Sequence, residues 1–284
     1  AQAGEDFAAG FDIGSDDDIR RIREQLGLDQ PFLVRFGGWA WGLLHGDLGT
    51  SIFTNLPVSR LIGQRIEATV SLTLCALLIS VLVAVPLGVI AAAKAERWID
   101  RCVMAFSVLG FSIPVFVVAY LLMLVFAIEL KWLPVQGYRN FSENFWDLLR
   151  HLILPSIALG TVYIALIARI TRASMLDVLA QDYIRTAQAK GLAPFSVLAG
   201  HALKNAAIPI MTIIGIGIAL LIRGAIVTET VFAIPGLGRL TVDAILPRDY
   251  PVIQGVILLF SGIYVLINLA IDLSYMLFDP RIRY

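Results

Sequence analysis

Uninterrupted apolar runs dominate this sequence of 284 residues and limit what it can fold into. A helix needs about 20 apolar residues to cross a bilayer, and the runs that meet this length lie at 66–93, 102–130, 152–175, 203–228 and 252–278. Only 15% of all residues are charged, whereas a soluble domain has about a quarter. The sequence therefore predicts an all-α, polytopic helical membrane protein with five spans.

Four prolines fall within or near the ends of these runs: Pro86, Pro114, Pro155 and Pro209. In a membrane bundle, neighbouring helices can satisfy the carbonyls that a proline frees, so kinks are tolerated there. Each run is therefore expected to remain one span.

Basic residues in the short loops indicate the orientation. One side of the predicted bundle holds Lys94, Arg97, Arg101, Arg169, Arg172, Arg185, Lys190, Lys204, Arg281 and Arg283. The other side holds fewer basic residues, in longer loops that also carry acids. The positive-inside rule makes the first side cytoplasmic. We therefore expect the N-terminal region and the 229–251 loop outside, the C-terminus inside, and an additional helix before the first residue to carry the N-terminal region across the membrane.

The first 65 residues have the most soluble character, and the sequence predicts two parts, an extracytoplasmic helical region at 1–65 and a transmembrane domain at 66–284. Ser15, followed by three aspartates, is typical of a helix N-cap, and Gly27 of a helix end. Trp39 and Trp41 suit a helix at the membrane interface.

A polar, basic segment rich in small residues at 181–209 separates two of the apolar runs. Gly191 predicts a break between two short helices, with Pro194 at the first position of the second. The alanines beside Gly191 leave a low surface that another protein could approach closely. Spacing alone leaves a second interpretation open, an amphipathic helix resting on the lipid interface.

Charged residues inside the runs are candidates for the transport path, because ionisable groups within a membrane are costly. Arg223 could face a water-filled cavity and meet an anionic group such as a peptide carboxylate. It could equally extend to the outer interface or pair with Glu229. Asn268 and Asp272 are one helical turn apart, and a structural polar clamp to a neighbouring helix is favoured there over a proton relay.

Several chemistries have no support in the sequence. Cys75 and Cys102 lack metal-ligand spacing, and the three histidines are scattered. The sequence contains no phosphate-binding loop, nucleophile elbow or zinc-protease helix. The formal net charge is zero and the basic residues are dispersed, so no nucleic-acid partner is expected.

A set of ordered motifs resembles the B-type permease subunit of dipeptide and oligopeptide ABC importers, within the methionine-importer-like (MetI-like) permease superfamily. The resemblance runs from about Leu26 to the last residue. The motifs are LGLDQP at 26–31, HGDLG at 45–49, QDYIRTAQAKGL at 181–192, TETVFAIPGLG at 228–238, RDYPVIQG at 248–255 and DPRIR at 279–283.

The resemblance implies a role for the 181–202 segment, which is similar to the EAA loop, the coupling helices that dock into a cleft of the ATPase subunit. The residues carried over as ATPase-coupling are Asp182, Tyr183, Arg185, Thr186, Ala187, Lys190, Gly191 and Leu192. Arg185 replaces the acid of the general motif, and Lys204 replaces its downstream proline. The family has six transmembrane helices in this subunit, so the first is expected to be missing here.

The resemblance also implies function, partners and location. The chain would be a non-catalytic permease subunit in a bacterial or archaeal inner or plasma membrane, paired with a homologous second permease. One or two ATPase subunits would bind ATP and magnesium, and no cofactor is expected in this chain. An extracytoplasmic binding protein would deliver peptides, or another solute such as a nickel complex, glutathione or a sugar. The rival hypotheses are an ATP-independent secondary transporter or channel and a membrane-embedded enzyme.

Overall fold

The structure, a computed structural model, describes residues 31–141 and 144–278, with side chains described to 273. The expected N-cap at Ser15, the helix end at Gly27 and the 279–283 motif lie outside the described residues. Within the described ranges the chain is helical, apart from loops and one isolated bridge between Thr50 and Pro57.

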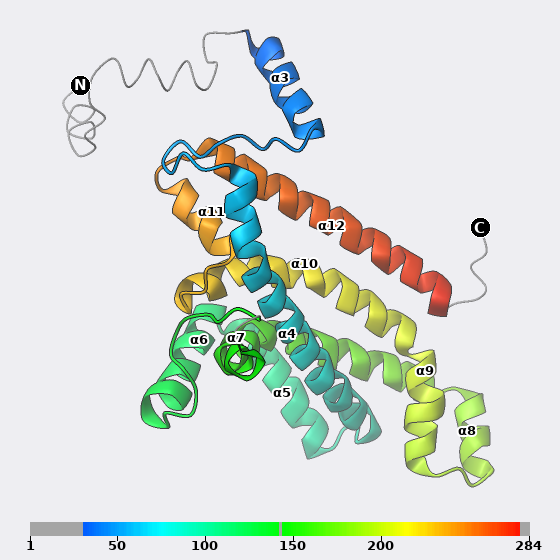
Figure 1. Ribbon diagram of the computed structural model, residues 1–284. Coiled ribbons are helices and arrows are strands. Elements are labelled where there is room, and N and C mark those ends of the chain that lie inside the picture. Colours follow the sequence, from blue (N-terminus) through cyan, green and yellow to red (C-terminus); the bar gives the residue numbers. More distant parts are fainter. Residues whose placement is uncertain (1–30, 142–143, 279–284) are drawn as a thin grey trace, which may run out of the picture.

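The helices follow one another as a series of long spans separated by short elements (Figure 1). The first half comprises α3 (Phe32–Leu44), α4 (Val58–Ala93), α5 (Trp98–Ser112), α6 (Val115–Leu122), the π-helix η1 (Met123–Glu129) and α7 (Phe145–Leu179). The second half comprises α8 (Asp182–Ala189), the π-helix η2 (Ser196–Ala202), α9 (Leu203–Asn205), α10 (Ala207–Val231), α11 (Leu237–Ile245) and α12 (Tyr250–Phe278).

Four of the five predicted spans are long, apolar helices in the described part of the chain: α4, α7, α10 and α12. The fifth predicted span, at 102–130, is a pair of helices broken at Pro114. There α5 and the α6–η1 segment meet at an angle of 107°. Pro114 disfavours helical geometry at the residue before it, and Ile113 is extended with φ −92° and ψ 123°. This stretch is therefore a broken span or a re-entrant loop.

Two of the remaining prolines agree with the expectation, whereas the start of the first span differs from it. Pro86 and Pro155 lie inside α4 and α7 and do not interrupt either helix. The first span begins at Val58 rather than at residue 66. Residues 58–65, assigned from sequence to the N-terminal region, thus form the first two turns of a membrane helix.

Small residues allow α4 and α7 to pack closely at the centre of the bundle. Buried alanines line both helices, among them Ala76 and Ala84 on α4 and Ala158 and Ala168 on α7. Small side chains bring backbones together, which is how membrane helices gain packing without a hydrophobic driving force. A Cβ added to Gly88 of α4 would lie 2.6 Å from Thr171 Cβ and 2.7 Å from Ala168 O.

We expect Gly88→Ala to lower the free energy of unfolding by about 1–3 kcal/mol, the usual cost of overpacking a tight contact. Gly63→Ala is a matched control, because Gly63 lies on the same helix with nothing within 4 Å of an added Cβ. The control should be neutral or slightly stabilising, since alanine favours helix more than glycine does. The free energy of unfolding of each variant is measured by titrating the purified protein with SDS in mixed micelles. Equal stability of the two variants would contradict the close contact.

A loop between η1 and α7 covers one end of the bundle. The Gly137 N–H donates to Phe232 O (3.0 Å), and the Tyr138 hydroxyl donates to Glu67 Oε1 (3.1 Å). Glu67 Oε1 also accepts from the Phe141 N–H (2.8 Å). Burial raises the pKa of Tyr138 above its usual value, so the phenol stays protonated and remains a donor. The loop thus joins the third turn of α4 to the residue that follows α10.

Candidate coupling site and transport path

Helix α8 and the residues that flank it form positions 181–191 of the polar, basic segment at 181–209. The Thr186 hydroxyl donates to Asp182 O (3.0 Å), and Arg185 Nη1 lies 3.4 Å from Asp182 Oδ1 at the surface. Gly191 ends the helix with φ +77°, a conformation that glycine adopts without strain. Its N–H donates to Gln188 O (2.9 Å). The predicted break at Gly191 is confirmed.

The two sides of α8 have different surroundings. Ile184 is fully buried and Ala187 is 8% exposed, so both pack against the chain itself. Ala187 is therefore a packing residue, and the low exposed surface expected here comes from Ala189 and Gly191. The other residues carried over from the coupling motif are exposed: Asp182, Tyr183, Arg185, Thr186, Lys190, Gly191 and Leu192.

A separate apolar cluster holds α8 against the bundle. Ile184 and Ala187 pack with Ala92 at the end of α4, Met175 of α7 and Ile210 of α10, together with η2. Helix resumes at Pro194, as predicted, and continues through η2 and α9 to a single non-helical residue, Ala206, before α10. Figure 1 shows α8 and α9 at the end of the bundle opposite α11. The segment is thus joined to α10 with only Ala206 between the two helices.

A buried ion pair lies at the adjoining ends of α5 and α7. Asp100 is 3% exposed; Arg172 Nη2 donates to its Oδ2 (2.6 Å) and Arg172 Nε donates to Oδ1. The Glu96 N–H also donates to Asp100 Oδ2 (2.9 Å). Sequence reasoning missed this pair and used Arg172 only for orientation. The available signal was an acid, Asp100, inside a short loop crowded with cations.

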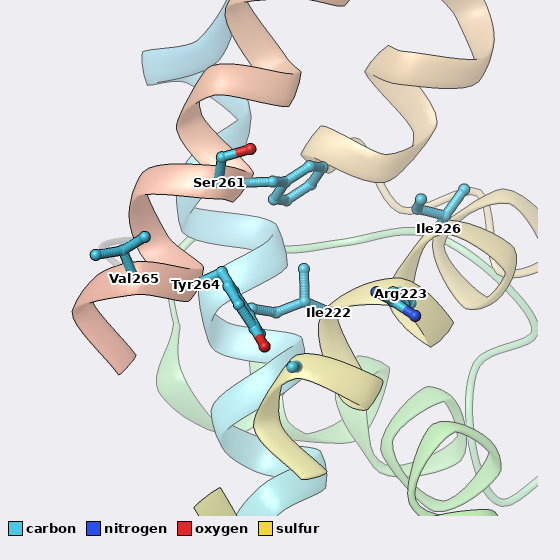
Figure 2. A pocket seen from close by; sticks show the side chains of 8 residues that line it. Ile222, Arg223, Ile226, Ser261, Tyr264 and Val265 are labelled. Atoms are coloured by element: carbon cyan, nitrogen blue, oxygen red, sulfur yellow. The ribbon is translucent and has the colours of Figure 1, made fainter. Parts of the chain in front are cut away.

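The structure places Arg223 on the exposed face of α10, away from Glu229. Within the described chain it makes no hydrogen bond or ion pair, so the suggested pairing with Glu229 is absent. Arg223 lines an open groove of about 350 Å³ between α10 and α12, opposite Ser261 and Tyr264 (Figure 2).

Glu229 does not line a path, contrary to the prediction, because it is fully buried. Its Oε1 accepts from the Thr69 hydroxyl (2.6 Å) and its Oε2 from the Arg239 N–H (3.0 Å). Thr69 Oγ1 in turn accepts from the Leu237 N–H (2.8 Å). These amides belong to the first turn of α11, which has no side-chain cap of its own. Glu229 therefore caps α11 from another helix.

The glycines of the Pro-Gly-Leu-Gly turn make room for this cap. An added Cβ on Gly238 would lie 2.9 Å from Glu229 Oε2, and one on Gly236 would overlap the same carboxylate. The apolar composition of the 229–251 loop is explained by α11, whose Leu237 and Leu240 pack against Val58 of α4 and Val256 of α12.

We expect Glu229→Ala to lower the free energy of unfolding by about 1–3 kcal/mol, because buried donors lose their acceptor. Glu129→Ala is the control, since Glu129 is exposed at the end of η1, and it should have little effect. Thermal unfolding in detergent compares the two variants. Equal melting temperatures would show that the carboxylate is not holding α11.

The predicted clamp at Asn268 and Asp272 is not formed within this chain. Asn268 Nδ2 donates to Tyr264 O of its own helix (3.0 Å) rather than to a neighbouring helix. Asp272 is exposed and has no partner among the described residues. The physical reason is that α12 packs on the bundle through a narrow face, which includes Ile271 beside Gly215 of α10, and only 6% of its apolar window is buried.

The HGDLG and RDYPVIQG motifs lie in contact, although no sequence pattern predicted this contact. The Ser51 hydroxyl, directly after the HGDLG motif, donates to Asp249 Oδ2 of the RDYPVIQG motif, and the Ile52 N–H donates to Asp249 Oδ1 (3.3 Å). Asp249 is 4% exposed. The motifs are therefore joined as one corner at the α11 end of the bundle.

Comparison with known proteins agrees with this architecture. The family of the binding-protein-dependent transport system inner membrane component matches residues 84–284. A probable peptide ABC transporter permease of Sinorhizobium fredii is 53% identical, over 94% of this chain and 85% of that protein. A dipeptide transport permease, DppB, of Alkalihalophilus pseudofirmus is 44% identical, over 94% and 86%. A glutathione transport permease, GsiC, of Salmonella choleraesuis is also 44% identical, over 94% and 84%.

The fold has solved counterparts. The MetNI methionine ABC transporter, in inward-facing conformations, matches with a TM-score of 0.63 at 18% identity, over 78% of this chain and 97% of the other. An amino acid ABC transporter matches with a TM-score of 0.55 at 15% identity, over 79% and 95%. The long apolar helices, the MetI-like fold and the family match over residues 84–284 together show that this chain belongs to the family of binding-protein-dependent transport system inner membrane components, the permease subunits of ABC importers.

Proposed function

We propose that this chain is one of two homologous permease subunits of an importer that carries peptides across an inner or plasma membrane. Relatives at 53% and 44% identity are named as peptide and dipeptide permeases, which supports this solute class. A relative at 44% identity is named for glutathione, itself a small peptide, so glutathione is the second candidate. Nickel complexes and sugars have less support.

The exposed face of α8 would dock into a cytoplasmic ATPase subunit. The observation that carries this proposal is the geometry of the segment: a short, polar helix ends in an exposed glycine turn and is packed on its other side against the chain's own helices. Such a helix moves with the bundle that holds it. ATPase closure would therefore displace α8, η2 and α10 as one body and shift the path between inward- and outward-facing states.

The partners would divide the work. One or two ATPase subunits would bind ATP and magnesium and hydrolyse the nucleotide, while this chain does no bond chemistry. A substrate-binding protein would deliver the solute at the α11 end, which would be the outer end by the positive-inside rule. There a cavity of about 900 Å³ lies between α3 and the Ser51–Asp249 corner.

Reconstitution tests the proposal. The chain, the second permease and the ATPase are purified as a complex and placed in liposomes with the binding protein outside and ATP inside. We expect ATP-dependent uptake of peptides that shift the melting temperature of the binding protein. Uptake without the ATPase would contradict the proposal and favour a secondary transporter. Uptake of a nickel chelate or sugar, but of no peptide, would replace the solute class.

A further inference from the structure

Two charged residues without partners lie on exposed helix faces within the apolar spans. Arg223 of α10 and Asp272 of α12 are exposed, and neither makes a hydrogen bond or ion pair within the described chain. A charge that faces lipid within a span is costly, so such residues usually face a water-filled cavity or a partner. The exposure and spacing of the residues on α10 and α12 identify the helix faces that carry these two charges.

The exposed face of α10 is opposite to the face that packs. Leu221, Ala225 and Glu229 follow one another at four-residue intervals and are at most 2% exposed. Ile216, Leu220, Arg223 and Val227 recur at intervals of three or four residues and are exposed. Because such intervals return to the same side of a helix, Arg223 belongs to one continuous open face.

A polar stripe, comprising Ser261, Tyr264, Asn268 and Asp272, runs along α12 with the same periodicity. The Ser261 hydroxyl and the Asn268 amide each donate to a carbonyl one turn back in α12. These bonds leave the oxygen lone pairs of both side chains available. On the opposite side of the helix lie Leu266 and Leu273, which are 65% and 50% exposed. The helix thus carries a polar stripe with Val265 beside it on one side and exposed leucines on the other, as expected where water and lipid lie on different sides.

The two open faces meet. Ser261 and Tyr264 of the polar stripe and Arg223 of α10 line the groove of about 350 Å³, together with apolar side chains such as Ile222 and Phe260. Figure 2 shows Ser261 and Tyr264 from one helix and Ile222 and Arg223 from the other along this groove. Its walls are apolar and its polar groups are few, which is the composition of small-molecule sites.

We propose that the polar stripe of α12 and the facing side of α10 line the solute path, and that Arg223 is the group that attracts solutes carrying a free carboxylate. The inference rests on the proposed function, because a path requires a transporter. To the proposed function, the inference adds which residues face water and which charge selects the solute. A guanidinium without a protein partner, in a groove with hydroxyls opposite, can bind a carboxylate with two parallel hydrogen bonds.

Thiol labelling tests the inference without knowledge of the solute. The native thiols are removed by Cys75→Ala and Cys102→Ala, and Ser261→Cys, Asn268→Cys or Leu266→Cys is introduced into the assembled importer in liposomes. The probes are an anionic reagent, sulfonatoethyl methanethiosulfonate, and a cationic one, trimethylammonioethyl methanethiosulfonate. Both probes react only with thiols in contact with water. Arg223→Gln is then added to the Ser261→Cys protein.

We expect the Ser261→Cys and Asn268→Cys thiols to react and the Leu266→Cys thiol to remain protected. In the Ser261→Cys protein, Arg223→Gln should lower the ratio of the anionic to the cationic labelling rate by about two- to fivefold. This is the size expected from loss of a screened charge interaction at short range. Equal labelling of Ser261→Cys and Leu266→Cys would overturn the placement of the path. An unchanged ratio would overturn the role of Arg223. Neither result would affect the ATPase requirement, which the reconstitution measures separately.

Discussion

The Gly191→Asp variant should assemble into the membrane complex but lose transport and solute-stimulated ATP hydrolysis. Gly191 has φ +77°, and nothing lies within 4 Å of an added Cβ. Aspartate tolerates this conformation better than most residues do, so the chain alone has space for it. The new carboxylate would instead project from the exposed turn that we assign to the ATPase contact. The effect is therefore expected in coupling and not in stability.

Gly46→Asp is the matched control for this variant. Gly46 has φ +80° and also has nothing within 4 Å of an added Cβ, but it follows α3, at the other end of the molecule from α8 (Figure 1). Both variants carry the same backbone strain and the same added charge. Uptake and ATP hydrolysis in liposomes should be abolished for Gly191→Asp and retained for Gly46→Asp. Normal coupling in Gly191→Asp would rule out the turn as the ATPase contact.

Arg172→Met should give the largest loss of stability, about 3–5 kcal/mol, because it leaves the Asp100 carboxylate buried without its cation. The double variant Arg172→Met with Asp100→Leu should recover most of this loss, since an apolar pair of similar size removes the unpaired charge. SDS-titrated unfolding in mixed micelles measures the free energy of unfolding of both proteins.

Arg169→Met is the control for position and charge. Arg169 lies on α7 one turn before Arg172, is exposed, and is 5.1 Å from the centre of the Phe111 ring. Loss of an exposed cation–π contact should cost no more than about 1 kcal/mol. If Arg172→Met lowered the free energy of unfolding as little as Arg169→Met, the ion pair with Asp100 would not stabilise the packing of α5 against α7.

Local signals predicted several parts of the site correctly. Gly191 marks the helix break and Pro194 the restart, because glycine and proline impose their backbone preferences on any neighbours. Pro114 shows the limit of the same reasoning. Pro86 and Pro155 remain inside continuous helices, whereas Pro114 breaks its span, and no local feature in the sequence distinguished them.

Side-chain partners were the least predictable feature. The sequence placed Arg223 and Glu229 as possible partners, but they lie on different faces of α10: one is exposed, and the other caps α11 with the help of Thr69. Thr69 and Glu229 are 160 positions apart. The Ser51–Asp249 contact spans 198 positions. Pattern rules extend over only a few turns of helix, so they contain no information about such contacts.

The sequence by itself determined the class of the protein, the number of apolar runs and the helix break at Gly191 in the segment that we propose for coupling, because hydropathy and backbone preference act locally. Only the tertiary structure decided what each polar residue in the membrane does. Burial against α4 makes Glu229 a structural cap, and the narrow packed face of α12 leaves Asn268 and Asp272 beside an open face. The reason is physical: the cost of a polar group depends on its surroundings, and packing between distant segments determines those surroundings.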